Sequence, residues 1–163
     1  METFDIAVIG AGAAGMMSAA VAGQQGRRVV LIDHAPRLAE KIRISGGGRC
    51  NFTNLYAGPD NYLSANPHFA RSALERYTPR DFMALLKRHR VTWHEKHKGQ
   101  LFCDHGSDAV IEVLRRECDA GGIAWRRPVA VDAVRHVPAD GFVLDTQAGH
   151  IAARALIVAT GGL

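Results

Sequence analysis

The sequence predicts an α/β fold in which a parallel sheet carries an added antiparallel meander. A short apolar run at residues 4–9 ends in glycine, as a buried parallel strand does. An alanine- and methionine-rich stretch at 13–25 favours a helix, and a β-branched run at 28–33 completes a strand–helix–strand unit. From residue 123 onward, alternating patterns bounded by turn residues predict the meander.

Composition narrows the class of protein. The chain has 163 residues, 47% hydrophobic and 22% charged, which suits one domain with a real core. The net charge is +4, and no run of lysine or arginine predicts a nucleic-acid partner. There is no apolar stretch of membrane-spanning length, and METFDIAVIG lacks a basic n-region and a long apolar h-region, so we expect no signal peptide. Three cysteines without a CxxC pair fit free thiols, so we expect a cytoplasmic protein without membrane or nucleic-acid partners.

Three glycines at the first strand–helix junction match the spacing GxGxxG. In such a turn Gly10 permits the tight bend, Gly12 lets a pyrophosphate approach the backbone, and Gly15 lets the helix pack close to the strand. The helix N-terminus, which begins with Ala13 and Ala14, offers free N–H groups and a positive dipole end to phosphates. The motif therefore predicts a phosphate site at this junction.

Asp33 ends the second strand, 23 residues after Gly10. A carboxylate there can accept hydrogen bonds from ribose hydroxyls, and it disfavours a 2′-phosphate. The strand before the motif, Gly26 after the helix and Asp33 supply the context that a glycine motif needs. Together they predict a dinucleotide site, although the motif does not choose between NAD and FAD.

After Asp33 the strand–helix repeat stops. Residues 34–66 show no sustained period, which predicts a long functional loop. Within it, KIRISGGGRCNFTN at 41–54 holds three consecutive glycines against which a planar ring could lie. Arg49 would place a fixed charge near a ring that gains negative charge on reduction, and the two asparagines could bond ring-edge atoms. A flexible glycine loop is the alternative.

The pairing of AVIGAGAAGMMSA with KIRISGGGRCNFTN resembles the HI0933-like family of bacterial flavoproteins, also called BaiN-type or aminoacetone-oxidase-like. The final LIVATGG resembles the strand and turn that such domains place beside the cofactor. The resemblance implies a Rossmann-like FAD-binding domain of the glutathione-reductase type over residues 1–163, with FAD as cofactor. Family members are longer, so we expect an incomplete N-terminal fragment, without the inserted substrate domain and the C-terminal return.

The resemblance also implies which residues bind the cofactor. The glycine motif and Asp33 would hold the AMP half, residues around 41–51 would lie along the ribityl chain and flavin, and Val131 would lie beside the adenine through its backbone. An ordinary core valine is the alternative for Val131, and a buried inert thiol is the alternative for Cys50. The expected cofactor-binding residues are Gly10, Gly12, Ala13, Ala14, Gly15, Asp33, His34, Lys41, Ser45, Gly46, Gly47, Gly48, Arg49, Cys50, Asn51, Val131, Thr160 and Gly161.

Two helices are predicted after the loop. At 78–90, Thr78 is an N-cap, Pro79 takes the first helical position and Asp81 the third. The second helix follows Ser107 and stops at Gly121. Between the two helices, four potential metal ligands lack the spacing of a zinc site, and a polar loop explains them, so we expect no metal. These four are His94, His97, Cys103 and His105.

The rest of the chain predicts strands. IAWRR would return to the parallel sheet, and VAVDAVRHV, FVLDT and HIAARALIVAT would form the meander, with ALIVAT entering the sheet again as a buried strand. Asp140-Gly141 and Ala148-Gly149 mark its hairpin turns.

We therefore expect the FAD-binding part of a flavin-dependent oxidoreductase. NAD(P)H would deliver hydride to flavin N5, and the flavin would reduce a small organic substrate. The alternatives are a flavin oxidase that uses O₂, a non-catalytic dinucleotide-binding module, and an NAD-only dehydrogenase, against which the break after Asp33 argues. The sequence names no acid–base residue, substrate or oligomeric state.

Overall fold

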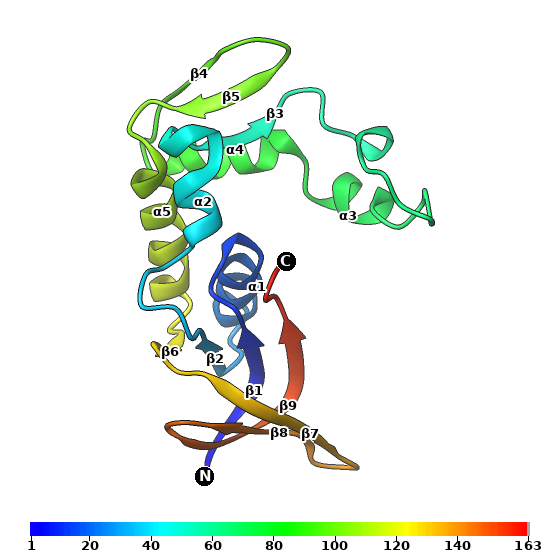
Figure 1. Ribbon diagram of the computed structural model, residues 1–163, viewed down its shortest axis with the longest axis vertical. Coiled ribbons are helices and arrows are strands. Elements are labelled where there is room, and N and C mark those ends of the chain that lie inside the picture. The colour runs from blue at the N-terminus through cyan, green and yellow to red at the C-terminus, as the bar shows by residue number, and fades with distance from the viewer. Residues whose placement is uncertain (163) are drawn as a thin grey trace. The chain divides into compact units, whose positions relative to one another are not determined.

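The computed structural model describes residues 1–162. Its contacts divide the chain into two compact units, which we call unit 1 (residues 1–41 and 114 onward) and unit 2 (residues 42–113). Figure 1 labels their helices and strands. Helices α2 (Glu40–Ile44) and α5 (Ser107–Ala120) contribute residues to both units.

Unit 1 is built on a six-stranded sheet of order β6-β2-β1-β9-β8-β7. Its parallel part comprises β6 (Ala124–Arg126), β2 (Val29–Ile32), β1 (Glu2–Ile9) and β9 (Gly149–Val158). All four residues of β2 are buried, as expected of a strand covered on both faces. Ile9 pairs with Ile32 on one side and with Val158 on the other, so the carboxyl ends of three strands reach one edge.

Helix α1 (Ala13–Gln24) connects β1 to β2, as predicted. Its alanines and methionines favour the helical backbone, and it buries Gly15, Met16, Ala19 and Ala20. The chain leaves the helix through Gly26, whose φ of +82° suits a residue without Cβ. The predicted strand–helix–strand unit is therefore confirmed.

The meander consists of β7 (Val131–Val137), β8 (Gly141–Thr146) and the first half of β9. Residues 149–153 of β9 pair antiparallel with β8, while residues 151–158 pair parallel with β1. One continuous strand thus closes the meander and enters the parallel sheet, as the predicted re-entry of ALIVAT requires (Figure 1). Both sheet parts share one core cluster, formed by Phe4, Ala7, Val30, Ile32, Leu144, Ile151 and Ala153.

Unit 2 holds a small antiparallel sheet of order β3-β5-β4. Its strands are β3 (Asn51–Asn54), β4 (Trp93–Glu95) and β5 (Gln100–Cys103), and its helices are α3 (Arg71–Arg76) and α4 (Pro79–Arg88). Two 3₁₀ turns, η1 (Ser45–Gly48) and η2 (Pro59–Asn61), complete it. Phe52 of β3 packs against the rings of Phe82 and Trp93, with centroids 5.9 and 6.1 Å away.

Two expectations about unit 2 are wrong. Residues 34–66 are not one long loop, because they contain α2, η1, β3 and η2. The histidine-rich segment is not a polar loop either, because it forms the β4–β5 hairpin. Elements of three to five residues are too short to show a hydrophobic period, and β3 pairs with a strand about 50 residues further along the chain.

Within residues 1–162, none of the helices has the length and apolar character that crossing a membrane requires.

Candidate dinucleotide-binding site

Three chain segments meet at the carboxyl edge of the parallel sheet in unit 1. Gly10 N–H donates to the Ile32 carbonyl at 2.8 Å, and Ala159 N–H donates to the Ile9 carbonyl at 2.8 Å. These bonds fix the ends of β2, β1 and β9 side by side. Ligands of open α/β sheets bind outside this edge, where neighbouring connections part to opposite faces.

Gly10 and Gly15 are glycines because the chain itself leaves no room for a side chain. Gly10 has φ +100°, and a Cβ there would overlap the carbonyl oxygen of Ala159. A Cβ on Gly15 would overlap the carbonyl oxygen of Gly10. The tight turn and the close helix–strand packing that the spacing predicts are both present. The chain after β9, at Ala159 and Thr160, packs against Gly10.

Gly12 is different, because nothing in the chain requires a glycine at its position. Its φ of −80° and ψ of −169° are open to any residue, and a Cβ there would meet no atom within 4 Å. Gly12 is the N-cap of α1 and provides no side-chain cap. Ala13 and Ala14 follow it with exposed methyl groups, and the first N–H groups of a helix have no intrahelical partner. This end of α1 therefore fits an anionic group that approaches the backbone closely.

Asp33 ties the glycine turn to the end of β2. One carboxylate oxygen accepts from the N–H of Ala11 at 2.5 Å, and the other accepts from the N–H of Ala35 at 2.7 Å. The side chain is 15% exposed, whereas that of His34 is 84% exposed. Each carboxylate oxygen has a second lone pair, which leaves it able to accept from a hydroxyl group as well. From the sequence, only the ribose contact of Asp33 was predicted, and its bonds to backbone N–H groups were missed. An aspartate that accepts from the N–H two residues later is a common turn motif, and this signal could have indicated the bond to Ala35.

Lys41 contacts the segment after β9, although it lies 121 residues before its hydrogen-bond partner Gly162 in the sequence. The Lys41 ammonium group donates to the Gly162 carbonyl, and a Cβ on Gly161 would lie 3.2 Å from Lys41 Nζ. Gly161 has φ +82°, and Thr160 before it is exposed. Lys41, Gly161 and Gly162 thus form one small cluster in unit 1, and Thr160 precedes it in the chain.

Val131 lies at the start of β7, opposite Thr146. The strand segment before it is bonded to the end of β2, since Asp33 N–H donates to Arg126 and Val129 N–H donates to the Asp33 carbonyl. The Val131 side chain packs against the core cluster of unit 1. The Val131 side chain is therefore that of an ordinary core valine, and only the backbone of Val131 could contact a ligand.

In unit 2 the three consecutive glycines all have left-handed backbone. Their φ angles are +58°, +69° and +85° for Gly46, Gly47 and Gly48, and the turn closes with Cys50 N–H donating to the Ser45 carbonyl at 3.1 Å. A Cβ on Gly46 would lie 2.8 Å from the Phe102 ring, whereas one on Gly47 would meet nothing within 4 Å. Gly47 and Gly48 are exposed, so this turn offers bare backbone.

The residues after these glycines divide into exposed and buried ones. Arg49 is exposed, whereas Cys50 is 1% exposed. Burial raises the pKa of the Cys50 thiol, which keeps it protonated and supports the inert-thiol alternative. Asn51 is exposed, and its amide nitrogen faces the carbonyls of Leu101 and Thr53, each 3.1 Å away. Asn51 is thus anchored to the sheet of unit 2.

Two of the four potential metal ligands of the hairpin region, His94 and His105, bond to other side chains. His94 Nδ1 lies 2.7 Å from an Asp104 carboxylate oxygen, and this hydrogen bond is the main reason why the pKa of Asp104 is lowered. His105 Nε2 lies 3.2 Å from the Thr92 hydroxyl. In the part of the chain that the structure describes, no three His, Cys, Asp or Glu side chains are placed to share a metal ion.

A glycine turn, an uncapped helix N-terminus and a strand-end carboxylate at one sheet edge define a Rossmann-type dinucleotide-binding domain. Residues 4–163 match the family model of the HI0933-like protein Rossmann domain, and the chain belongs to this family. The resemblance seen in the two sequence motifs is thereby confirmed, as is the fold class.

Two curated proteins are similar to this chain in sequence along nearly its whole length. It is 50% identical over 163 residues to the ribosomal RNA dihydrouridine synthase of Escherichia coli K12, covering 100% of this chain and 40% of that protein. It is 28% identical over 164 aligned positions to the 3-dehydro-bile acid delta(4,6)-reductase of Clostridium scindens, covering 96% of this chain and 39% of that protein. The chain thus spans about two fifths of the length of these relatives.

Solved structures agree on the fold. Glycine oxidase from Geobacillus kaustophilus superposes with a TM-score of 0.60 at 16% identity, covering 99% of this chain and 56% of that one. At this identity the likeness concerns the fold alone. Family and fold together support a flavin-binding module of the oxidoreductase class.

Proposed function

We propose that this chain is the FAD-binding portion of an enzyme that reduces a carbon–carbon double bond conjugated to a carbonyl group. The two relatives' names describe such chemistry. Dihydrouridine differs from uridine by saturation of the C5–C6 bond, which is conjugated to the C4 carbonyl. The delta(4,6) bonds of a 3-dehydro bile acid are conjugated to its 3-oxo group. The identity of 50% across the whole chain favours uridine in ribosomal RNA as the substrate.

One observation carries the cofactor assignment. Gly12 has unstrained backbone and an unobstructed Cβ direction, so neither backbone strain nor a collision requires a glycine there. A pyrophosphate laid against the end of α1 gives one, because its oxygens need the backbone N–H groups at close range. In this assignment the α1 N-terminus would hold the pyrophosphate, Asp33 would accept from the adenosine ribose, and the backbone at Val131 would border the adenine.

The remaining candidate residues are assigned to the other half of FAD. Lys41 and the Thr160–Gly161 backbone would hold the chain between pyrophosphate and ring, and Ser45 to Asn51 would border the ring. Bound FAD would supply hydride transfer through its N5 atom. Arg49 would place a permanent positive charge near the ring, which stabilises an anionic reduced state. We propose that the rest of a full-length protein supplies the substrate domain and closes this site.

We further propose NADH or NADPH as the electron donor. The expectation of no nucleic-acid partner rested on the lack of a continuous basic run. A basic surface patch assembled from separate segments shows no such run, so RNA is compatible with this sequence.

The test uses the full-length holoenzyme under anaerobic conditions. Ribosomal RNA that lacks the modification is incubated with NADH, with NADPH or without donor, and its nucleosides are analysed by mass spectrometry. We expect dihydrouridine only when a donor is present. Hydrogen peroxide formed in air without any RNA product would favour the oxidase alternative. An FAD-loaded protein that neither donor reduces would favour the non-catalytic module.

A further inference from the structure

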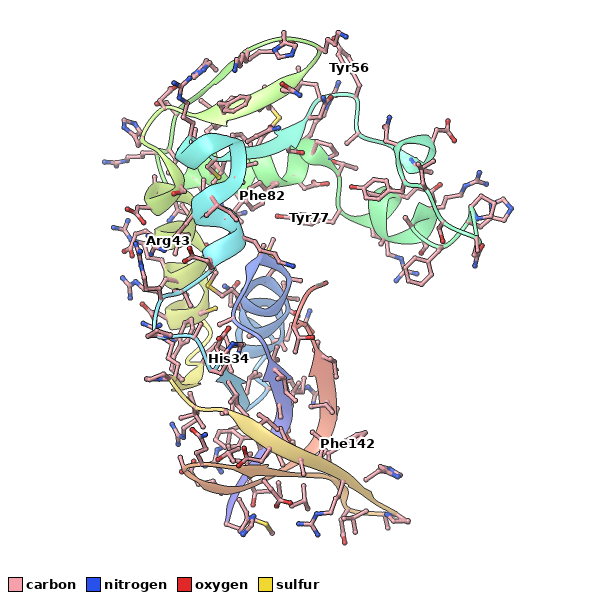
Figure 2. All side chains as sticks on the ribbon, viewed as in Figure 1. His34, Arg43, Tyr56, Tyr77, Phe82 and Phe142 are labelled. Carbon is pink, nitrogen blue, oxygen red and sulfur yellow. The ribbon has the colours of Figure 1, made fainter. Side chains whose placement is uncertain are left out.

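An exposed tyrosine ring lies on the turn of the β4–β5 hairpin in unit 2. Tyr56 is 74% exposed, and Figure 2 labels it beside this turn. A Cβ on Gly99 would lie only 2.6 Å from Tyr56 Cδ2, so the ring covers the bare backbone of that glycine. Leu55 N–H donates to the Gly99 carbonyl at 2.8 Å, which holds the segment before the tyrosine against the turn.

The turn that carries this ring is well fixed. Asn54 bridges the two segments, because its amide donates to the Lys98 carbonyl at 2.9 Å and accepts from the Tyr56 N–H at 2.8 Å. Gly99 N–H donates to the Glu95 carboxylate at 2.9 Å. Lys98 and Gly99 both have left-handed backbone, with φ of +52° and +76°. A ring held in this way loses little conformational freedom when a ligand stacks on it.

The turn that the ring contacts is rich in basic residues. Lys96, His97 and Lys98 form the turn and are all exposed, and Lys96 Nζ lies 5.3 Å from the centroid of Phe102. Residues 71–98 carry eight Lys or Arg and three Asp or Glu, whereas the rest of the chain carries twelve and thirteen. The net positive charge of the chain is therefore concentrated in this stretch. We call Tyr56, Lys96, His97 and Lys98 the turn patch.

An exposed aromatic ring among cations suits single-stranded nucleic acid. An unpaired base stacks on the ring and the phosphates on either side attract the cations. A protein interface would place apolar groups at its centre and few lysines, and this patch has one ring among three basic residues. We propose that the turn patch binds an unpaired stretch of RNA, with a base stacked on Tyr56 and phosphates contacted by Lys96 and Lys98. This inference rests on the proposed RNA substrate.

The experiment measures RNA affinity of the full-length holoenzyme by fluorescence anisotropy. The probe is a fluorescein-labelled single-stranded oligouridine, titrated at several salt concentrations. Tyr56→Ala should weaken binding roughly tenfold, as loss of one base–aromatic stack does, and Tyr56→Phe should bind as wild type does. Lys96→Gln with Lys98→Gln should reduce the slope of log K against log salt by about 1.4, since each phosphate contact contributes about 0.7 on a single strand.

A charge-matched control removes two exposed arginines of unit 1. Arg27→Gln with Arg154→Gln should leave the salt slope unchanged, because neither arginine belongs to the turn patch that is proposed to contact the phosphates. Flavin content and the thermal midpoint are measured for every variant. They should equal those of wild type, because the altered side chains are exposed.

The outcomes separate two possible failures. If wild type binds RNA and the patch variants bind equally well, the turn patch is wrong and the RNA substrate stands. If Tyr56→Ala lowers the thermal midpoint without changing RNA affinity, polypeptide covers the ring and the inference is also overturned. If wild type binds no RNA and forms no dihydrouridine, the proposed substrate itself fails.

Discussion

At the scale of single residues, the three motif glycines are present for two different physical reasons. Gly10 and Gly15 face backbone carbonyl oxygens where a Cβ would collide, so folding requires them. Gly12 faces open space with an ordinary φ, so folding does not. This difference separates a residue kept for the ligand from residues kept for the fold, and it can be tested directly.

Gly12→Ala should leave the fold intact and weaken FAD binding at least roughly tenfold, because the new methyl group occupies the approach to the helix end. The unfolding free energy should fall by no more than about 1 kcal/mol, the usual cost of an alanine at a helix N-cap. Chemical denaturation and titration of the apoprotein with FAD measure the two quantities. Gly58→Ala is the matched control, since Gly58 has φ −152° and equally open space, and it should change neither. Full FAD affinity in Gly12→Ala would contradict the assignment.

Asp33→Ala should weaken FAD binding and also lower the unfolding free energy. The carboxylate accepts from the N–H groups of Ala11 and Ala35, and hydrogen bonds to a charged group contribute about 1.5–3 kcal/mol. A lost ribose contact would add about 1–3 kcal/mol to the binding free energy. Asp5→Ala is the control, because Asp5 also accepts from a backbone N–H, that of Arg28, at 2.9 Å. We expect Asp5→Ala to lower stability alone, and an unchanged FAD dissociation constant in Asp33→Ala would show that Asp33 serves only the fold.

Cys118 should resist thiol reagents in the folded protein. It is fully buried, its Sγ lies 3.2 Å from the Met16 carbonyl, and burial raises its pKa to about 12. Burial also raises the pKa of Cys50 and Cys103. Iodoacetamide at mildly alkaline pH followed by mass spectrometry should find all three unmodified until denaturant is added. Rapid alkylation of Cys50 without denaturant would revive its candidacy as a reactive group.

At the scale of elements, α4 shows a helix start that the sequence specifies completely. Thr78 accepts from Asp81 N–H at 3.4 Å, and the Asp81 carboxylate accepts from the Thr78 backbone N–H at 2.7 Å and hydroxyl at 2.6 Å. Thr78→Ala should lower the unfolding free energy by about 1 kcal/mol. The helix then buries Leu85 and Leu86.

This cap also predicts a pH dependence. The hydrogen bond from Thr78 lowers the pKa of Asp81 below its ordinary value of 3.8. A carboxyl group with a lowered folded-state pKa stabilises the fold above its unfolded pKa, and this contribution is lost as the pH falls through the folded value. The stability difference between wild type and Asp81→Asn should therefore be constant near neutral pH and should shrink below pH 3.8. Denaturant unfolding across this range measures it, and a difference that persists in strong acid would show that charge is not its origin.

Sequence reasoning succeeded for elements with a strong local signal. Such a signal is a hydrophobic period, a cap or a turn residue that lies within the element or next to it in the sequence. It is present for β1, β2, α1, α4, α5 and the meander. It failed for α2, α3 and the sheet β3-β5-β4, whose elements are short. Phe52 shows why, since its partners Phe82 and Trp93 lie far along the chain and only the fold brings them together. The same holds for the site. The glycine motif could be predicted from the sequence, whereas the bonds of Asp33 to Ala11 and Ala35 were seen only in the structure.

At the scale of the whole molecule, the two units carry different chemistry. Unit 1 presents a helix N-terminus, a carboxylate and the Lys41 cluster at the carboxyl edge of its sheet. Unit 2 carries a turn of exposed glycines and the basic stretch that holds the net charge of the chain. In the functions proposed above, the edge of unit 1 and the glycine turn of unit 2 would serve the cofactor, and the basic stretch would serve RNA.

The central claim is that this protein binds a dinucleotide flavin through its adenylate half. Calorimetric titration of the full-length apoprotein with FAD and, separately, with FMN tests it most directly. FMN lacks the AMP half, for which the glycine turn, the α1 N-terminus and Asp33 are assigned. We expect FAD to bind at least roughly a hundredfold more tightly than FMN, about the sum of one pyrophosphate and one ribose contact. Equal affinity for FMN, or no affinity for FAD, would contradict it.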